Sequence, residues 1–159
     1  MVFRPKARVV VVDDQATHNL LLGVILRRAG YEVTPCEDAA LAIPAIAQGC
    51  DCVITDYQMP GMNGIELIQA ARRRVRPVLP VFVVLTGSDG PGLRERALAA
   101  GADLVIHKPA EPPLILAVLD RLFSPEQRGH VPPRFPAKFD REAGGMDSRD
   151  FARQNRSRR

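Results

Sequence analysis

Short apolar runs alternate with longer segments of mixed polarity along the first 123 residues. Most of the runs are rich in valine and isoleucine, a composition typical of strands that are buried on both faces. The longer segments repeat apolar residues at helical spacing. The pattern predicts five strands, at residues 8–12, 31–36, 51–56, 81–86 and 102–107. It also predicts five helices, at residues 17–29, 38–48, 64–75, 93–100 and 113–123.

The first two predicted helices carry local signals. An apolar stripe along the helix at residues 17–29 is formed by Leu20, Leu21, Val24, Ile25 and Ala29. Gly30 is expected to end that helix. Asp38 is the expected N-cap of the helix at residues 38–48. Pro44 lies inside this second helix and predicts either a kink or a later start, because proline cannot donate a backbone hydrogen bond.

Regular alternation of strand and helix predicts the α/β fold class with a parallel sheet. Right-handed crossover connections leave few possible topologies. We expect a doubly wound, flavodoxin-like sheet of five strands in the order 2-1-3-4-5, with five helices on its two faces. A C-terminal tail should follow this domain. In such folds a ligand binds outside the carboxyl ends of the strands.

The charge is unevenly distributed. Residues 1–123 hold 13 Lys+Arg and 13 Asp+Glu, so the whole formal charge of +4 lies in residues 124–159. We expect a domain at residues 1–123 and a flexible basic tail, rich in proline, glycine and arginine, at residues 124–159. An ordered segment near residues 135–139 is the alternative. The charge pattern argues against a nucleic-acid-binding fold, although the tail could touch nucleic acid or an acidic partner.

Composition also excludes two kinds of protein. No apolar run approaches the roughly 20 residues of a membrane span, and two aspartates end the first apolar stretch too early for a signal peptide. A cytoplasmic location with no membrane contact is therefore expected. The three cysteines, Cys36, Cys50 and Cys52, are odd in number and lack zinc-site spacing. They are expected to be small, buried, reduced thiols.

Polar residues gather where the predicted strands end. Asp13 and Asp14 follow the first strand, Asp56 ends the third, Thr86 ends the fourth and Lys108 follows the fifth. Because the carboxyl ends of parallel strands meet at one edge of a sheet, these side chains should converge. Clustered carboxylates repel one another, and a hard divalent cation such as Mg²⁺ relieves that repulsion. The cluster therefore predicts a Mg²⁺ site suited to phosphoryl transfer.

The other groups of the cluster fit the same chemistry. A carboxylate such as that of Asp56 can act as a nucleophile and form an aspartyl phosphate. The ammonium group of Lys108 can bind a phosphoryl oxygen as a point charge. The hydroxyl of Thr86 can donate a hydrogen bond to another phosphoryl oxygen. These roles are chemical possibilities that the residue types permit.

With these residues in view, residues 9–123 resemble the receiver domain of bacterial two-component response regulators, and especially single-domain regulators of the chemotaxis type. Asp56 lies 30 residues before Thr86, which lies 22 residues before Lys108, and this combination is specific to the family. The motifs are Val11-Val12-Asp13-Asp14, Asp56-Tyr57-Gln58-Met59-Pro60-Gly61-Met62-Asn63-Gly64, Leu85-Thr86-Gly87 and His107-Lys108-Pro109.

The resemblance implies a role for each matching residue. Asp56 would accept a phosphoryl group from the phosphohistidine of a histidine kinase or phosphotransfer protein. Asp14 and Asp56 would bind Mg²⁺ directly, together with the backbone carbonyl of Gln58, and Asp13 would hold the cation through water. Lys108 would pair with the acyl phosphate.

The family also implies how the signal is passed on. Thr86 would move toward the phosphoryl group and change the surface formed by the fourth helix, the fifth strand and the fifth helix. That surface would bind a downstream protein or a second copy of the chain. The bond between Lys108 and Pro109 would be cis. Such a domain phosphorylates and slowly dephosphorylates itself, and is not an enzyme that turns over an external substrate.

Some positions depart from the family pattern or stand beside it. Val105 occupies the place of the usual switch aromatic, so the coupling of Thr86 to the output surface is in question. His107 is expected to be a half-buried residue at a strand end, and His18 a surface residue of the first helix. Gln58 and Ser88 flank the phosphoryl site and could tune the lifetime of the phosphoryl group.

Three alternatives remain. A phosphohydrolase of the haloacid dehalogenase type also uses an aspartate nucleophile, but it needs an Asp-x-Asp motif, and Gln58 stands two residues after Asp56. A receiver fold could act as a scaffold that needs no phosphorylation. The chain could be a complete single-domain regulator, which we favour, or the receiver fragment of a longer effector protein.

Overall fold

A computed structural model of the chain describes residues 4–74, 78–88 and 90–123. The predicted tail at residues 124–159 lies outside these residues. The strands are β1 (Arg8–Val12), β2 (Glu32–Cys36), β3 (Cys52–Asp56), β4 (Val81–Thr86) and β5 (Leu104–His107). The helices are α1 (Ala16–Arg28), α2 (Ala39–Ala47), α3 (Gly64–Arg74), α4 (Leu93–Ala100) and α5 (Pro112–Leu122).

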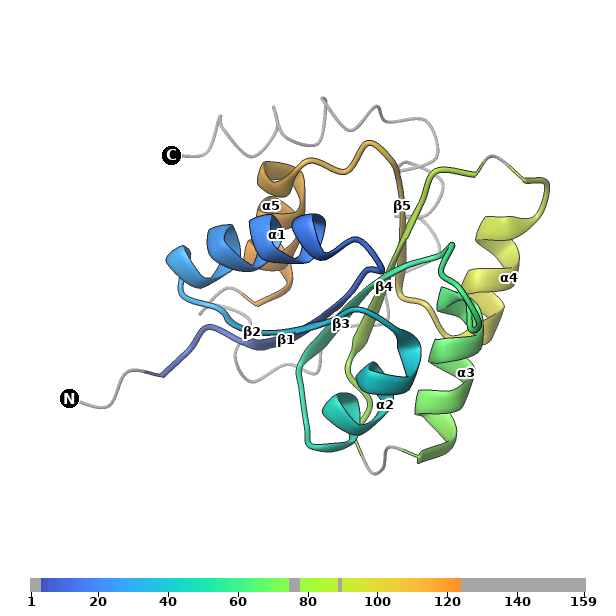
Figure 1. Ribbon diagram of the computed structural model, residues 1–159, viewed down its shortest axis with the longest axis horizontal. Coiled ribbons are helices and arrows are strands. Elements are labelled where there is room, and N and C mark those ends of the chain that lie inside the picture. Colours follow the sequence, from blue (N-terminus) through green and yellow to red (C-terminus); the bar gives the residue numbers. More distant parts are fainter. Residues whose placement is uncertain (1–3, 75–77, 89, 124–159) are drawn as a thin grey trace. The chain divides into compact units, whose positions relative to one another are not determined.

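The strands form one parallel sheet in the order β2-β1-β3-β4-β5, which confirms the predicted flavodoxin-like topology (Figure 1). In the register, Val10 lies opposite Val53 and Val53 lies opposite Phe82. The three central strands are buried along almost their whole length, because helices cover the sheet. Only Arg8, the first residue of β1, is exposed among the residues of these strands.

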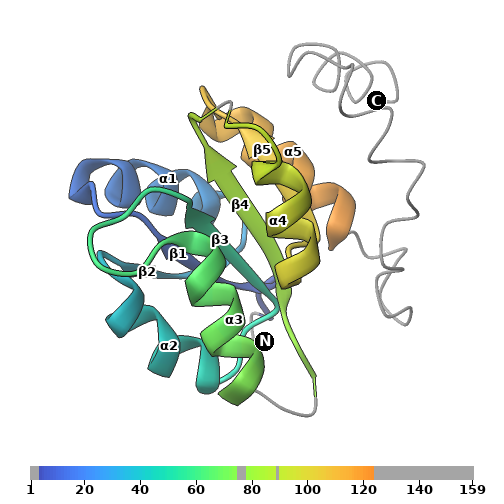
Figure 2. The ribbon, with the colours of Figure 1, turned by 90° about the vertical axis from the view of Figure 1, so that its right-hand side faces the viewer.

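The helices of the first compact unit, which ends at Pro109, lie on both sides of the sheet. Figure 2 shows α1 on one side and α2 and α3 on the other. Val53, Phe82 and Val84 face the α2–α3 side, where they form one buried cluster with residues such as Leu67 and Ile68 of α3. Alternation of side chains along each strand supplies both faces of the sheet with apolar residues.

The last helix, α5, belongs to the second compact unit, which begins at Ala110. It starts with two prolines, which suit the first turn of a helix because the first backbone N–H groups have no partner within the helix. Its buried residues recur at helical spacing and are Ile115, Val118, Leu119 and Leu122. The predicted fifth helix is therefore confirmed.

The apolar stripe of the first helix is not its buried face. Helix α1 buries Asn19, Leu22, Gly23 and Leu26 instead. The three residues of the stripe that are exposed are Leu20 at 66%, Leu21 at 55% and Val24 at 38%. With leucine at three successive positions, apolar side chains point to several sides of a helix, so periodicity alone does not identify the packed face.

Helix α2 begins at Ala39, before Pro44, so of the two effects expected of this proline, a kink or a later start, the later start is wrong. The carboxylate of Asp38 accepts a hydrogen bond of 2.7 Å from the N–H of Leu41, as expected of the N-cap. Pro44 lies inside the helix and is exposed. Solvent can therefore satisfy the carbonyl group that a proline leaves without a partner.

Two expectations about composition are also tested by the fold. All three cysteines are free thiols, and Cys36 and Cys52 are buried as predicted, whereas Cys50 is only half-buried. Burial raises the pKa of the Cys50 thiol to about 11 and raises the pKa values of Cys36 and Cys52 as well.

In the described parts of the chain, every helix is too short or too polar to cross a membrane.

Candidate functional site

Three carboxylates meet at the carboxyl edge of the sheet. Asp13 and Asp14 directly follow β1, and Asp56 is the last residue of the neighbouring strand β3. One oxygen atom from each side chain lies within 4.8 Å of the others. Asp13 and Asp56 are buried, whereas Asp14 is exposed. The parallel register of β1 and β3 therefore brings together the acidic residues that the sequence predicted at this edge.

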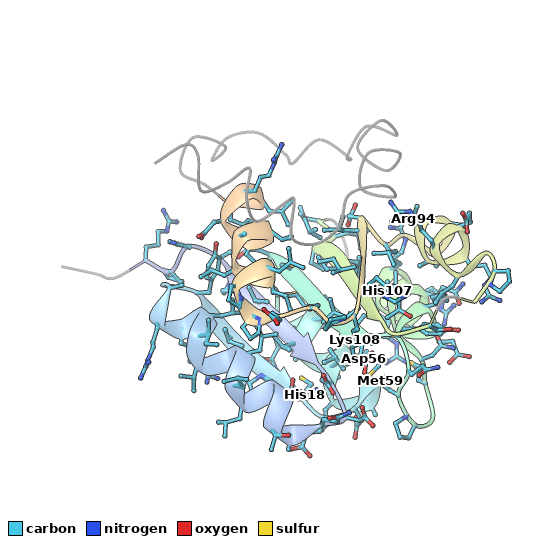
Figure 3. All side chains as sticks on the ribbon, turned by 90° about the horizontal axis from the view of Figure 1, so that it is seen from above. His18, Asp56, Met59, Arg94, His107 and Lys108 are labelled. Atoms are coloured by element: carbon cyan, nitrogen blue, oxygen red, sulfur yellow. The ribbon has the colours of Figure 1, made fainter. Side chains whose placement is uncertain are left out.

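Lys108 places a positive charge at this cluster. Its Nζ atom lies 3.0 Å from Oδ2 of Asp56, and Figure 3 shows the two side chains together. The N–H of Lys108 donates a 2.7 Å hydrogen bond to the carbonyl of Thr86, so the pairing of β4 and β5 continues up to the lysine. The peptide bond between Lys108 and Pro109 is cis, as expected.

The first turn of α1 holds Asp13 at several atoms. Oδ1 of Asp13 accepts a 2.9 Å hydrogen bond from the N–H of Gln15, and Oδ2 lies 3.4 Å from Nδ1 of His18. The carbonyl oxygen of Asp13 accepts a 2.8 Å hydrogen bond from Nδ2 of Asn19. His18 is exposed, as expected, but it also contacts the acidic cluster. Asp13 thus has a fixed side chain and a fixed main chain.

Thr86 is buried at the end of β4, and its hydroxyl is engaged in its own loop. Oγ1 of Thr86 accepts a 3.0 Å hydrogen bond from the N–H of Ser88 and lies 3.5 Å from the Ser88 carbonyl oxygen. This is the short hydroxyl-to-backbone turn that serine and threonine often form. To donate to a group bound at Asp56, the Thr86 hydroxyl would give up the 3.5 Å contact with the Ser88 carbonyl oxygen and could still accept from the Ser88 N–H.

A hollow of about 190 Å³ lies beside Thr86 and is bordered by the start of α4 and by β5. Val105, at the position of the expected aromatic, is part of its lining. Nη1 of Arg94 lies 3.5 Å from the Val105 carbonyl oxygen. His107 is exposed, so the expectation that it is half-buried is wrong. Its Nδ1 lies 2.7 Å from the Lys108 carbonyl oxygen.

The loop after Asp56 is fixed by close packing onto α3. A Cβ atom added to Gly64 would lie 2.6 Å from the Asp56 carbonyl oxygen, so only glycine allows this approach. The N–H of Gly64 donates a 2.9 Å hydrogen bond to the carbonyl of Tyr57. Asn63 and Glu66 cap the helix reciprocally, with side chain to N–H distances of 3.0 and 2.9 Å.

The response regulator receiver domain family matches residues 9–120. The chain belongs to this family. A probable chemotaxis protein CheY of Rhizobium etli is 32% identical over 120 residues, which cover 74% of this chain and 93% of that protein. The transcriptional regulatory protein FixJ of Bradyrhizobium diazoefficiens is 32% identical over 118 residues, and these residues cover 72% of this chain but only 56% of FixJ.

Solved structures agree with this assignment. The structure of chemotaxis protein CheY4 of Vibrio cholerae matches 72% of this chain and 97% of its own, with a TM-score of 0.66 and 32% sequence identity. Receiver domains are signalling domains of two-component systems and are generally not turnover enzymes. The family and the fold that the sequence implied are therefore confirmed.

The donor set of this receiver domain fits a magnesium ion. The clustered groups are carboxylate oxygens, which are the ligands that Mg²⁺ prefers, and the exposed Asp14 leaves one side open to water and phosphate. Gln58 lies in the loop after β3 and lines a hollow of about 430 Å³ together with Tyr57, Met59, Pro60 and Asn63. Three carboxylates outnumber the single ammonium group of Lys108, so the site retains negative charge for a cation.

Sequence reasoning missed one residue of the receiver site, Asn19. Asn19 stands directly before three leucines in a predicted helix. A polar residue at such an apolar position indicates a buried hydrogen-bond partner, because buried polar groups are almost always hydrogen-bonded. Leucine at three successive positions hides this signal, because apolar side chains then point to several sides of the helix.

Proposed function

We propose that this receiver domain is phosphorylated on Asp56 in a Mg²⁺-dependent reaction and that the phosphoryl group changes its affinity for a partner. The observation that carries this proposal is the position of Lys108. Its ammonium group lies 3.0 Å from Oδ2 of Asp56, beside the oxygens of Asp13 and Asp14. The proposed donor is the phosphohistidine of a histidine kinase or of a phosphotransfer protein, in the cytoplasm.

Several residues of the chain have separate roles in the proposed phosphoryl transfer. A carboxylate oxygen of Asp56 attacks phosphorus, and the bond from phosphorus to the leaving group of the donor breaks, which leaves an acyl phosphate. Lys108 binds one phosphoryl oxygen through its charge. Asp13, Asp14, Asp56 and the Gln58 carbonyl would hold Mg²⁺, which neutralises charge on the phosphoryl oxygens when it is bound.

The proposed output depends on Thr86. Its hydroxyl hydrogen leaves the Ser88 carbonyl oxygen for a phosphoryl oxygen, and Gly87 and Ser88 follow Thr86. This movement shifts the population between two arrangements of the surface that includes α4 and β5. A downstream protein or a second copy of the chain would bind one arrangement better than the other.

The test is phosphorylation by a small donor. The full chain is incubated with acetyl phosphate, with and without Mg²⁺, and its intact mass is measured. We expect one phosphoryl adduct that requires Mg²⁺ and is absent from Asp56→Asn. Glu32→Gln is the matched control, because Glu32 is an exposed carboxylate at the opposite end of the sheet. An adduct that persists in Asp56→Asn would mean that another residue is the acceptor.

One observation favours a second function, that of a scaffold that needs no phosphorylation. Val105 offers no ring that could move between a buried and an exposed position, so one usual link from Thr86 to the output surface is missing. If the wild-type chain forms no adduct, the scaffold becomes the better account. Partner binding would then be equal for the wild type and Asp56→Asn.

A further inference from the structure

Asn19 is a buried amide on the packed face of α1. It is 3% exposed, and its neighbours on this face are Leu22, Gly23 and Leu26. None of the motifs that identify the family includes it. A polar side chain among apolar ones is retained in a core only when its hydrogen bonds have a use.

The amide group of Asn19 joins two strand ends. Nδ2 donates a 2.8 Å hydrogen bond to the carbonyl of Asp13 and a 3.0 Å hydrogen bond to the carbonyl of Cys36. The N–H of Asp13 donates to the same Cys36 carbonyl at 3.1 Å. One side chain therefore connects the first turn of α1 to the ends of β1 and β2, at the residue that precedes Asp14.

The oxygen of the same amide has a different environment. Oδ1 of Asn19 is buried and accepts no hydrogen bond from the part of the chain that the structure describes. An unpaired buried acceptor destabilises a fold, and an apolar side chain of similar volume would avoid this cost. The two Nδ2 hydrogen bonds, and not stability alone, therefore account for asparagine at this position.

We propose that Asn19 is a positioning residue for the metal site. By fixing the main chain of Asp13, it directs the carboxylates of Asp13 and Asp14 toward that of Asp56. The position of the Asp13 carboxylate depends on this main chain, because the carboxylate accepts a hydrogen bond from the nearby N–H of Gln15 and so cannot turn independently. Asp14 depends on it because it directly follows Asp13, so the same main chain places its Cα atom. The inference rests on the proposed function, in which these residues hold Mg²⁺.

The experiment compares cation affinity in the full chain and in Asn19→Ala. Mn²⁺, followed by its electron paramagnetic resonance, gives a dissociation constant that needs no phosphoryl transfer. Residues that orient metal ligands alter metal affinity by roughly ten-fold or more, so we expect Kd to rise by about ten-fold. In the acetyl phosphate reaction, the Mg²⁺ concentration for half-maximal rate should rise similarly, while the rate at saturating Mg²⁺ stays close to that of the wild type.

Leu22→Ala is the matched control. Leu22 lies on the same face of α1, so its truncation should lower the melting temperature but leave the Mn²⁺ dissociation constant unchanged. If Asn19→Ala does not fold, Asn19→Ser keeps one donor and should give an intermediate Kd. The positioning role is overturned if the folded Asn19 variant has the Mn²⁺ dissociation constant of the wild type. It is also overturned if Leu22→Ala raises that constant by the same factor.

The outcomes separate this inference from the proposed function. In one outcome, Asn19→Ala binds Mn²⁺ more weakly than the wild type, and the wild type forms no phosphoryl adduct. That outcome would support the positioning role of Asn19 and reject Asp56 as the acceptor. An adduct on Asp56 with equal Mn²⁺ affinity in both proteins would do the reverse. A wild type that binds neither Mn²⁺ nor Mg²⁺ overturns the positioning role, because there would be no metal site to position.

Discussion

The ammonium group of Lys108 controls the charge balance of the site at the scale of single residues. It lies 3.0 Å from a carboxylate that is almost completely buried and that has two more carboxylates nearby. A buried charge that loses its partner destabilises a fold far more than an exposed one. The receiver domain therefore depends on Lys108 for stability as well as for the proposed chemistry, and a bound cation should partly replace it.

Lys108→Met is expected to lower the free energy of unfolding by about 1–2 kcal/mol in chelator. This is less than for a fully buried pair, because the Lys108 side chain is 30% exposed. In saturating Mg²⁺ the loss should shrink, since the cation supplies positive charge. Urea unfolding measures both values, with Arg96→Met on the exposed side of α4 as control. An equal loss with and without Mg²⁺ would mean that Lys108 acts through packing.

At the scale of elements, the junction of β3 and α3 determines where Asp56 points. The helix begins so close to the strand end that the Asp56 carbonyl fills the space beside Gly64. Asn63 and Glu66 then hold the first turn of the helix. The end of β3 and the start of α3 are therefore packed directly against each other.

Gly64→Ala should disturb this junction. The new methyl group would meet the Asp56 carbonyl oxygen at 2.6 Å, so the main chain must shift at a cost of about 1–3 kcal/mol. We expect a lower melting temperature and slower adduct formation from acetyl phosphate. Gly87→Ala is the control for the melting temperature, because the nearest atom to an added Cβ lies 4.0 Å away. Unchanged stability and rate in Gly64→Ala would show that the helix can retreat freely.

Across the whole molecule, sequence and structure agree where burial decides the outcome. Runs of valine and isoleucine predicted every strand except β2, and strand ends predicted which residues meet, because parallel strands share one edge. The packed face of α1 was missed, since three successive leucines do not define one side of a helix. The partners of the Thr86 hydroxyl and of Asn19 depend on loop geometry, which hydrophobic periodicity does not encode.

The buried thiols give a prediction for the molecule as a whole. Burial raises the pKa of Cys50 to about 11 and also raises those of Cys36 and Cys52, so the folded chain keeps these thiols neutral where the unfolded chain ionises them. The free energy of unfolding should therefore be unaffected below about pH 8 and fall as the pH rises through the range from 9 to 11.

Urea unfolding at several pH values measures this effect. A variant with all three cysteines replaced by alanine is the control and should lose less stability over the same range. Thiol reagents at pH 8 should react far more slowly with the native chain than with the unfolded chain. Rapid modification of the native protein would show that at least one thiol is open to solvent and ionised.

The contacts that hold the Thr86 hydroxyl at the main chain of Ser88 affect the background level of the proposed signal. The hydroxyl donates to the Ser88 carbonyl oxygen at 3.5 Å, and a hydrogen bond of that length is weak enough to break before any phosphoryl group is present. Two arrangements separated by little free energy are both visited at rest. The proposed sensor should therefore have a background output before any stimulus, and a stimulus should change how often that output occurs.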